Sequence, residues 1–365
     1  MNFHQTSRAE AAPGQKTIAL LRERDLSLPV TTIHGNRPGP RVLLTAGIHG
    51  CEYCSIQAAI ELASELDQDV VAGRLTIVHL ANASGFSERL SEIVAEDGKN
   101  LNRVFPGRDD GSQAERLAHL ITSLQDDADF YVDMHGGDLH ESMHPLVFIP
   151  GVAEKRITDR AREAAKVLDV DVRVLSSATT GAYNSAALRG VPSLLIERGG
   201  NGVWSRAEVD AYKRDIRALL AHLQLLPPVT GLPCREQREI RDAVYLTSKD
   251  QGCWYPEVTP GAPVSRGTVL GTVRDIFGRA IDCYRAEKDG IILYMTVSLA
   301  VKAGTPLDPP LRGASAPEIQ EICNMPALSS SGARKSILDG PRPARRPFHI
   351  KNTPSGKHHH GTAPT

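Results

Sequence analysis

The stretch Leu43–Glu52, which reads LLTAGIHGCE, decides the fold of this chain. An apolar run typical of a buried strand ends there, and helical spacing begins directly after it. His49 and Glu52 therefore stand three residues apart between a strand end and a helix start, where ligands bind in α/β sheets. Together with His135, far downstream, they form the smallest three-ligand set for a catalytic zinc ion, one per chain, whose fourth position stays open to water.

Other interpretations of these residues remain open on the sequence alone. The chain has 13 histidines, so chance supplies on the order of one His-x-x-Glu pair. Without a metal, His49 would be hydrogen-bonded to a helix-start carboxylate. His140 and His144 compete with His135 as ligands. Asp133 is placed to orient the ring of His135, or alternatively to cap the glycine-rich turn that follows.

Two further groups carry candidate chemistry. Glu197 ends the apolar run 193–196, and a carboxylate directly after a buried strand is costly unless it has a task. We interpret it as a general base, with an ion pair to Arg198 or another cation as the alternative. Asn102 and Arg103 lie in a polar stretch without regular periodicity. Arg103 can hold a substrate carboxylate with two hydrogen bonds and Asn102 can add a third, or Arg103 is structural.

The order of apolar segments predicts an α/β domain, followed by an all-β domain and a tail. Strands alternate with helices of ten or more residues, which indicates a mixed sheet with helices on both faces. The expected strands are 17–22, 30–33, 41–46, 75–81, 130–134 and 191–197. The expected helices are 52–66, one opened by the capping box Ser112–Glu115, 154–168, and one from the capping box Ser205–Glu208 to about 226.

The domain boundaries follow from changes in composition. We expect a catalytic domain over residues 1–230 and a small, barrel-like all-β domain over 231–312, where glycine turns separate short β runs. Residues 313–365 are expected to be a disordered basic tail, because 329–365 carry seven Lys or Arg against one acidic residue and few apolar side chains.

Bulk properties exclude several classes of protein. A net charge of −1 gives no general attraction to nucleic acid or to an anionic membrane. Residues 1–10 contain no apolar segment of a secretory signal, and no apolar run approaches the length of a membrane span. We therefore expect a cytoplasmic protein. Its six cysteines, Cys51-x-x-Cys54 among them, are interpreted as free thiols.

Four motifs together resemble the succinylglutamate desuccinylase/aspartoacylase family of zinc-carboxypeptidase-like deacylases. They are GIHGCE at 47–52, DGKNLNRVFPG at 97–107, DMHGGDLHE at 133–141 and IERGGNG at 196–202. The resemblance implies a zinc-carboxypeptidase-like α/β fold and a zinc-dependent hydrolase that removes the acyl group from an N-acylated amino acid. It also makes a homo-oligomer plausible.

The resemblance also implies a role for each motif residue. His49, Glu52 and His135 become the zinc ligands, Glu197 the catalytic base, and Asn102 with Arg103 the clamp on the substrate carboxylate. Family members commonly use a further arginine to stabilise the oxyanion, and Arg89 is the candidate here. The all-β domain resembles lipoyl and biotinyl carriers, but its central hairpin at 274–278 lacks the lysine that carriers modify, so we reject a carrier role.

Three other functions compete with the deacylase. A metallocarboxypeptidase would use the same site, with Arg103 holding a peptide C-terminus. A non-catalytic binder would keep the fold without the chemistry, which the presence of Glu197 beside all three ligands disfavours. The basic tail would bind nucleic acid or an acidic partner, and its three consecutive histidines at 358–360 would bind a metal, although such segments are usually only solvated.

Overall fold

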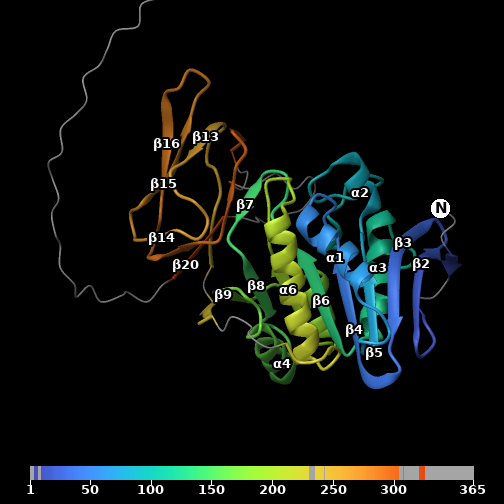
Figure 1. Ribbon diagram of the computed structural model, residues 1–365. Helices are drawn as coiled ribbons and strands as arrows, with labels where there is room; N and C mark the ends of the chain where they lie inside the picture. The colour runs from blue at the N-terminus through green and yellow to red at the C-terminus, as the bar shows by residue number, and fades with distance from the viewer. Residues whose placement is uncertain are drawn as a thin grey trace, which may run out of the picture. The chain divides into compact units, whose positions relative to one another are not determined.

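A mixed sheet of ten strands forms the main part of the structure (Figure 1). The computed structural model describes residues 10–229, 235–241, 243–303 and 307, and the backbone of two further strands, 4–6 and 320–324. The strands of the main sheet, in spatial order, are β1 (His4–Thr6), β2 (Gln15–Glu23), β3 (Leu26–His34), β5 (Ala72–Val78), β4 (Arg37–Ala46), β6 (Phe130–His135), β10 (Ser193–Glu197), β8 (Leu146–Pro150), β9 (Val172–Ser176) and β11 (Arg238–Ile240). The main sheet therefore extends past residue 230.

Three neighbouring parallel strands bring their carboxyl ends to one edge of the sheet. In the ladder between β4 and β6, Ala46 pairs with Met134. In the ladder between β6 and β10, His135 pairs with Glu197. Because the strands are parallel and in this register, the residues that follow each strand emerge side by side, as expected for a ligand site in an α/β sheet.

Both faces of the sheet are covered by helices, as the sequence predicts. Alternate residues of β6 enter opposite cores, with Phe130 and Val132 on one side and Tyr131 on the other. The first core is completed by α1, α4 and α6, and the second by α3 and α5. The helices are α1 (Tyr53–Glu65), α2 (Ala83–Glu88), the 3₁₀ turn η1 (Leu101–Arg103), α3 (Gln113–Asp126), α4 (Lys155–Ala165), α5 (Ala182–Leu188) and α6 (Arg206–His222).

Local sequence signals explain where the helices begin. At the start of α3, the backbone N–H of Ser112 donates a hydrogen bond of 2.8 Å to the side chain of Glu115, as expected for the glutamate of a capping box. At the start of α6, the Ser205 side chain accepts a hydrogen bond from the backbone N–H of Glu208. The expected strands and long helices are all present, whereas α2, α5 and the strands β7, β8, β9 and β11 had no clear periodic signal.

The chain after β11 forms small antiparallel sheets without any helix among its described residues. One sheet has the order β12 (Ala243–Leu246), β20 (Gln320–Asn324), β17 (Gly290–Ile292) and β14 (Pro263–Val264). The other has the order β16 (Ala280–Arg285), β15 (Val269–Arg274), β13 (Gly252–Pro256) and β19 (Ala300–Val301).

Two strands of this β region have consequences for the expected organisation. Strand β18 (Tyr294–Thr296) pairs antiparallel with β7 (Glu141–Met143), which directly follows the His135 motif. Strand β20 falls within the segment expected to be a tail, and it pairs with β12 and β17. The rest of the predicted tail, with its three histidines, lies outside the described residues. No helix of the described chain is long and apolar enough to cross a bilayer.

Candidate active site

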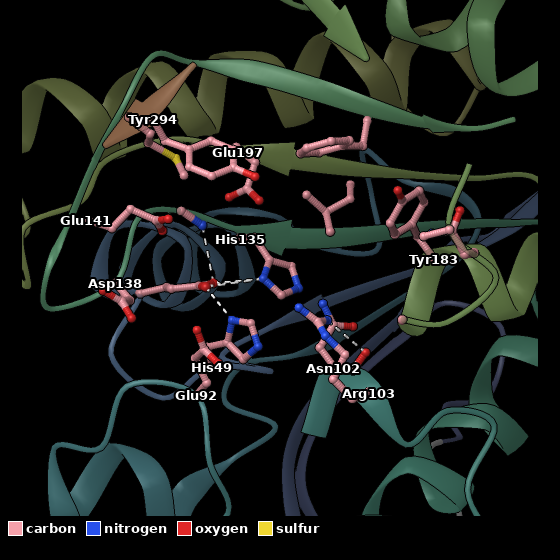
Figure 2. A pocket seen from close by; sticks show the side chains of 18 of the residues that line it. His49, Glu92, Asn102, Arg103, His135, Asp138, Glu141, Tyr183, Glu197 and Tyr294 are labelled. Atoms are coloured by element: carbon pink, nitrogen blue, oxygen red, sulfur yellow. Dashed lines mark hydrogen bonds and ion pairs between the residues drawn. The ribbon is translucent and has the colours of Figure 1, made fainter. Parts of the chain in front are cut away.

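Two histidines and one glutamate meet at the carboxyl ends of β4 and β6. His49, Glu52 and His135 each offer a donor atom within 4.8 Å of the others, and all three side chains are buried. His49 Nδ1 lies 2.7 Å from Glu52 Oε1, and His135 Nδ1 lies 3.0 Å from Glu52 Oε2. Figure 2 shows the imidazoles of His49 and His135 close together among the side chains that line the pocket. The structure thus brings together the three residues that the sequence selected as ligands.

The backbone between β4 and α1 explains this convergence. Gly47 has a φ of +69°, which lets the chain turn sharply after the strand. A Cβ at Gly50 would lie 2.2 Å from the backbone nitrogen of Phe86, so only glycine fits where these two segments touch. Glu52 then occupies the N-cap position of α1. The bend turns the side chains of His49 and Glu52 toward the same point.

The electrostatics of the trio favour a bound cation. Burial opposes the charge on Glu52, but the facing His135 and His49 lower the pKa of Glu52 to about 2. Burial likewise opposes charge on His135, and the carboxylates of Glu52 and Asp133 raise the pKa of His135 well above its usual value. A carboxylate that stays ionised between two imidazole nitrogens is a donor set that suits a divalent transition metal, zinc included.

Polar groups face the remaining nitrogen of both imidazole rings, with a hydrogen bond at His49 and a close contact without hydrogen-bond geometry at His135. His49 Nε2 lies 3.2 Å from Asn100 Oδ1, and His135 Nε2 lies 3.2 Å from Asp133 Oδ1. Such partners orient metal-binding histidines. The competing candidates do not join the group of donors: His140 is absent from it, and His144 Nε2 instead contacts Asp171 Oδ1 at 2.6 Å. These residues therefore fit a metal ion in a donor set of His49, Glu52 and His135.

Glu197 lies at the end of β10, next to the metal-binding candidates. Its Oε2 atom is buried and has no hydrogen-bond partner among the described residues. Burial and the nearby carboxylates, Glu52 first among them, raise the pKa of Glu197 well above its usual value, although His135 opposes this. The alternative ion pair with Arg198 does not form, because Arg198 Nε contacts Asp215 Oδ2 at 2.6 Å. Glu197 is thus a carboxyl group in the cavity that can exchange a proton.

Asn102 and Arg103 line the same cavity from η1. Asn102 Oδ1 accepts a hydrogen bond of 2.9 Å from the backbone N–H of Ala182, at the start of α5. Arg103 Nη1 donates to the backbone oxygen of Asn102 at 3.2 Å. These contacts hold both side chains on the wall formed by η1 and α5, on the opposite side of the trio from Glu141 and Asp138 in Figure 2.

Arg89 is placed differently from the other candidates. It ends α2 in the left-handed conformation, with a φ of 55°, and it is exposed. It is not among the described residues that line the cavity. The contact with the oxyanion that the resemblance implies therefore has no support from this geometry.

The cavity has a volume of about 170 Å³ and contains residues that the sequence did not single out. Its described lining comprises His49, Glu52, Glu92, Asn102, Arg103, His135, Gly136, Asp138, Glu141, Met143, Phe148, Ala178, Thr180, Gly181, Tyr183, Asn184, Leu195, Glu197 and Tyr294. Asp138 and Glu141 lie inside a quoted motif but had no assigned role. No sequence pattern indicated that Glu92 and Tyr294 line the cavity. Glu92 comes from a loop, and Tyr294 reaches the cavity through the pairing of β18 with β7.

The fold and the site define the class of this protein: an α/β protein with a candidate three-donor metal centre at the strand ends. Comparison with known proteins makes the class specific. Residues 38–223 match the model of the succinylglutamate desuccinylase/aspartoacylase catalytic domain. The chain belongs to the succinylglutamate desuccinylase/aspartoacylase family, as its motifs predicted, and is an amidohydrolase of the deacylase type.

Relatives in sequence and in structure agree with this placement. The chain is 32% identical, over 76% of its length and 83% of the relative, to an N-alpha-acetyl-L-2,4-diaminobutyric acid deacetylase of Halomonas elongata. The product-bound ectoine utilization protein EutE of Ruegeria pomeroyi superposes with a TM-score of 0.74 at 26% identity, covering 85% of this chain and 94% of that one. A succinylglutamate desuccinylase of Silicibacter sp. TM1040 superposes with a TM-score of 0.69 at 26% sequence identity. The match covers 79% of this chain and 90% of that one.

Proposed function

We propose that this protein is a zinc-dependent deacylase that hydrolyses the amide bond of an N-acylated amino acid. The observation that carries the proposal is the convergence of His49, Glu52 and His135 beside Glu197 in one cavity. In this proposal the three residues hold one zinc ion per chain. When bound, zinc lowers the pKa of water from 15.7 to about 7 and polarises the scissile carbonyl.

The protein residues then perform the remaining steps. Arg103 and Asn102 bind the carboxylate of the amino acid, which directs the amide carbonyl toward the metal-binding residues. Glu197 takes a proton from the attacking water at its buried carboxylate and delivers a proton to the leaving nitrogen. The carbon–nitrogen bond breaks, and the products are a carboxylic acid and a free amino acid. The raised pKa of Glu197 supports this role, because a group that releases the proton again must not be too strong an acid.

A metallocarboxypeptidase acting on small peptides is the second candidate, because the same groups would hold a peptide C-terminus. The Halomonas elongata relative is a deacetylase, which supports the first candidate. The expected homo-oligomer and the boundaries of the all-β domain stay predictions.

The test compares N-acetyl and N-succinyl amino acids with dipeptides as substrates of the full-length, zinc-loaded protein. We expect one zinc per chain, faster hydrolysis of N-acyl amino acids, loss of activity on chelation and recovery with zinc. Faster cleavage of dipeptides would favour the carboxypeptidase. Stoichiometric zinc without hydrolysis of either class of substrate would instead favour a non-catalytic binder.

A further inference from the structure

The described lining of the cavity includes three carboxyl groups that the proposed mechanism does not use, Glu92, Asp138 and Glu141. Glu92 and Asp138, which we call the acidic pair, line the cavity together with the metal-binding candidates. They come from separate parts of the chain, Glu92 from the loop before η1 and Asp138 from the turn after β6. Charged side chains in a buried site are costly unless a partner compensates them. A ligand group of opposite charge would therefore stabilise the acidic pair.

Hydrogen bonding leaves acceptor atoms of the pair unused. Asn100 Nδ2 donates to Glu92 Oε2 at 2.8 Å, and among the described residues this is the hydrogen bond that Glu92 makes. Asp138 Oδ1 accepts from the backbone N–H of His140 at 2.7 Å. Asp138 Oδ2, however, accepts no hydrogen bond of good geometry among the described residues, although the side chain is only 3% exposed and the Ser91 side chain approaches the carboxylate. Buried polar atoms without a partner are uncommon in proteins and call for an explanation.

The charges of the proposed reaction are balanced without the acidic pair. The two charges of a divalent ion and the Arg103 guanidinium match the charges of Glu52, Glu197 and one substrate carboxylate, while Glu141 adds a further lining carboxyl group beside the acidic pair. Arg103 is the one arginine or lysine among the described lining residues. Burial, with the like charges of Asp138 and Glu141, raises the pKa of Glu92 to about 7, although His49 and Arg103 oppose this shift, so a negative charge on Glu92 is unfavourable here. A cationic ligand group would relieve that cost.

We propose that Glu92 and Asp138 bind a primary ammonium group of the substrate, so that the enzyme selects N-acylated amino acids that carry a second, free amine. This inference rests on the proposed function and names the substrate class of the same cavity. Two sources provide the ammonium: the side chain of a diamino acid, or an amine on the acyl group, as in a dipeptide. The Halomonas elongata relative is named for an N-acetylated diamino acid, which supports the first source.

The test uses substrates that differ only by an ammonium or a methyl group. N-acetyl-2,4-diaminobutyrate is compared with N-acetylnorvaline, in which a methyl replaces the side-chain ammonium. Glycylnorvaline is compared with propionylnorvaline, in which a methyl replaces the ammonium of the acyl group. We expect kcat/KM to be about 10- to 100-fold higher for the charged member of one pair, mainly through KM, because a hydrogen bond to a charged group is lost with the methyl. The pair that shows the preference identifies the source.

Glu92→Gln tests the assignment to residues. Glutamine still accepts the hydrogen bond from Asn100, so we expect zinc content to stay at one per chain while the charged-to-neutral ratio of kcat/KM falls by about 10-fold or more. Asp138→Asn should lower the same ratio. Glu88→Gln, which changes an exposed carboxylate of α2, is the matched control and should leave the ratio unchanged.

A binding measurement separates the failure of this inference from the failure of the proposed function. Calorimetry on zinc-loaded protein compares 2,4-diaminobutyrate with norvaline, and glycine with propionate; the charged compound of one comparison should bind more tightly, and Glu92→Gln should remove the difference. Equal hydrolysis and equal binding of charged and neutral partners would overturn the inference while leaving the deacylase intact. If neither these four substrates nor the N-acetyl and N-succinyl amino acids tested above are hydrolysed, the deacylase is refuted, and calorimetry alone decides whether the acidic pair binds an ammonium.

Discussion

The hydroxyl of Tyr212 on α6 lies 3.0 Å from the backbone oxygen of His135, at the end of β6. The same hydroxyl lies 2.6 Å from the backbone oxygen of Ile196, at the end of β10. One fully buried side chain thus ties together the two strand ends that present a metal-binding candidate and the candidate base. A group that touches neither substrate nor metal can therefore set the distance between His135 and Glu197.

We expect Tyr212→Phe to loosen this junction. Loss of a buried hydrogen bond costs about 1–2 kcal/mol of stability. Because two strand ends lose a shared contact, zinc affinity and kcat should both fall, with KM changed less. Urea unfolding, zinc titration and steady-state kinetics measure these three effects.

Tyr284→Phe is the matched control for that variant. Tyr284 is also buried, and its hydroxyl accepts a hydrogen bond from the backbone N–H of Lys249 in the β region. A similar loss of stability without loss of zinc affinity is expected. Equal zinc affinity in both variants would show that Tyr212 contributes only to folding.

Glu197→Gln should keep the metal and lose the reaction. The variant has nearly the same shape but cannot accept a proton, and general acid–base catalysis typically contributes about 10²- to 10⁴-fold in rate. We expect kcat to fall by that factor while bound zinc stays at one per chain. An active Glu197→Gln variant would remove this residue from the mechanism.

The site could be predicted from the sequence where residues are close in the chain or end a strand. The segment 43–52 contains both the apolar strand and the two ligands, and 130–135 carries its histidine at the last strand position. The parallel register of β4, β6 and β10 then brings these ends together without further information. The four motifs, taken in their order along the chain, were therefore enough to indicate the family.

The rest of the cavity depends on contacts that no local pattern encodes. Tyr294 reaches it only because β18 pairs with β7, about 150 residues earlier in the chain. Helix α5 has seven residues, too few for a periodic signal, yet its first backbone N–H holds Asn102. Strand β20 was missed because the apolar residues of 320–324 stand in a segment whose overall composition resembles a tail.

Arg103→Gln tests the carboxylate clamp. Removing a charged hydrogen-bond donor from the cavity should lower kcat/KM by about 10- to 100-fold, mainly through KM, if the clamp holds substrate and transition state equally. Arg89→Gln provides the comparison, because Arg89 is exposed and does not line the cavity. We expect near wild-type kinetics for it. A large fall in kcat in Arg89→Gln would restore the oxyanion role that the family resemblance implied.

The capping box of α3 should make stability depend on pH in the acid range. The backbone N–H of Ser112, followed by Lys99, lowers the pKa of Glu115 from 4.5 to about 2. Because the folded-state pKa is the lower one, this stabilisation is complete above about pH 4.5 and is lost as the pH falls toward 2. Glu115→Ala should thus be less stable than wild type at pH 6, and the difference should shrink below pH 4. Urea unfolding at both pH values measures it, and an equal difference at both would refute the assignment.

Asp215→Ala should destabilise the fold next to the candidate base. Asp215 is 1% exposed and its Oδ2 contacts Arg198 Nε, so the variant leaves a buried guanidinium directly after Glu197 without its carboxylate partner. Breaking a buried pair in this way typically costs about 3–5 kcal/mol, whereas an exposed pair contributes about 0–1 kcal/mol. Asp109→Ala, which breaks the exposed pair with Arg24, is the control. We expect the urea midpoint to shift strongly for Asp215→Ala and little for Asp109→Ala. Similar shifts would show that the buried pair is not what fixes the end of β10.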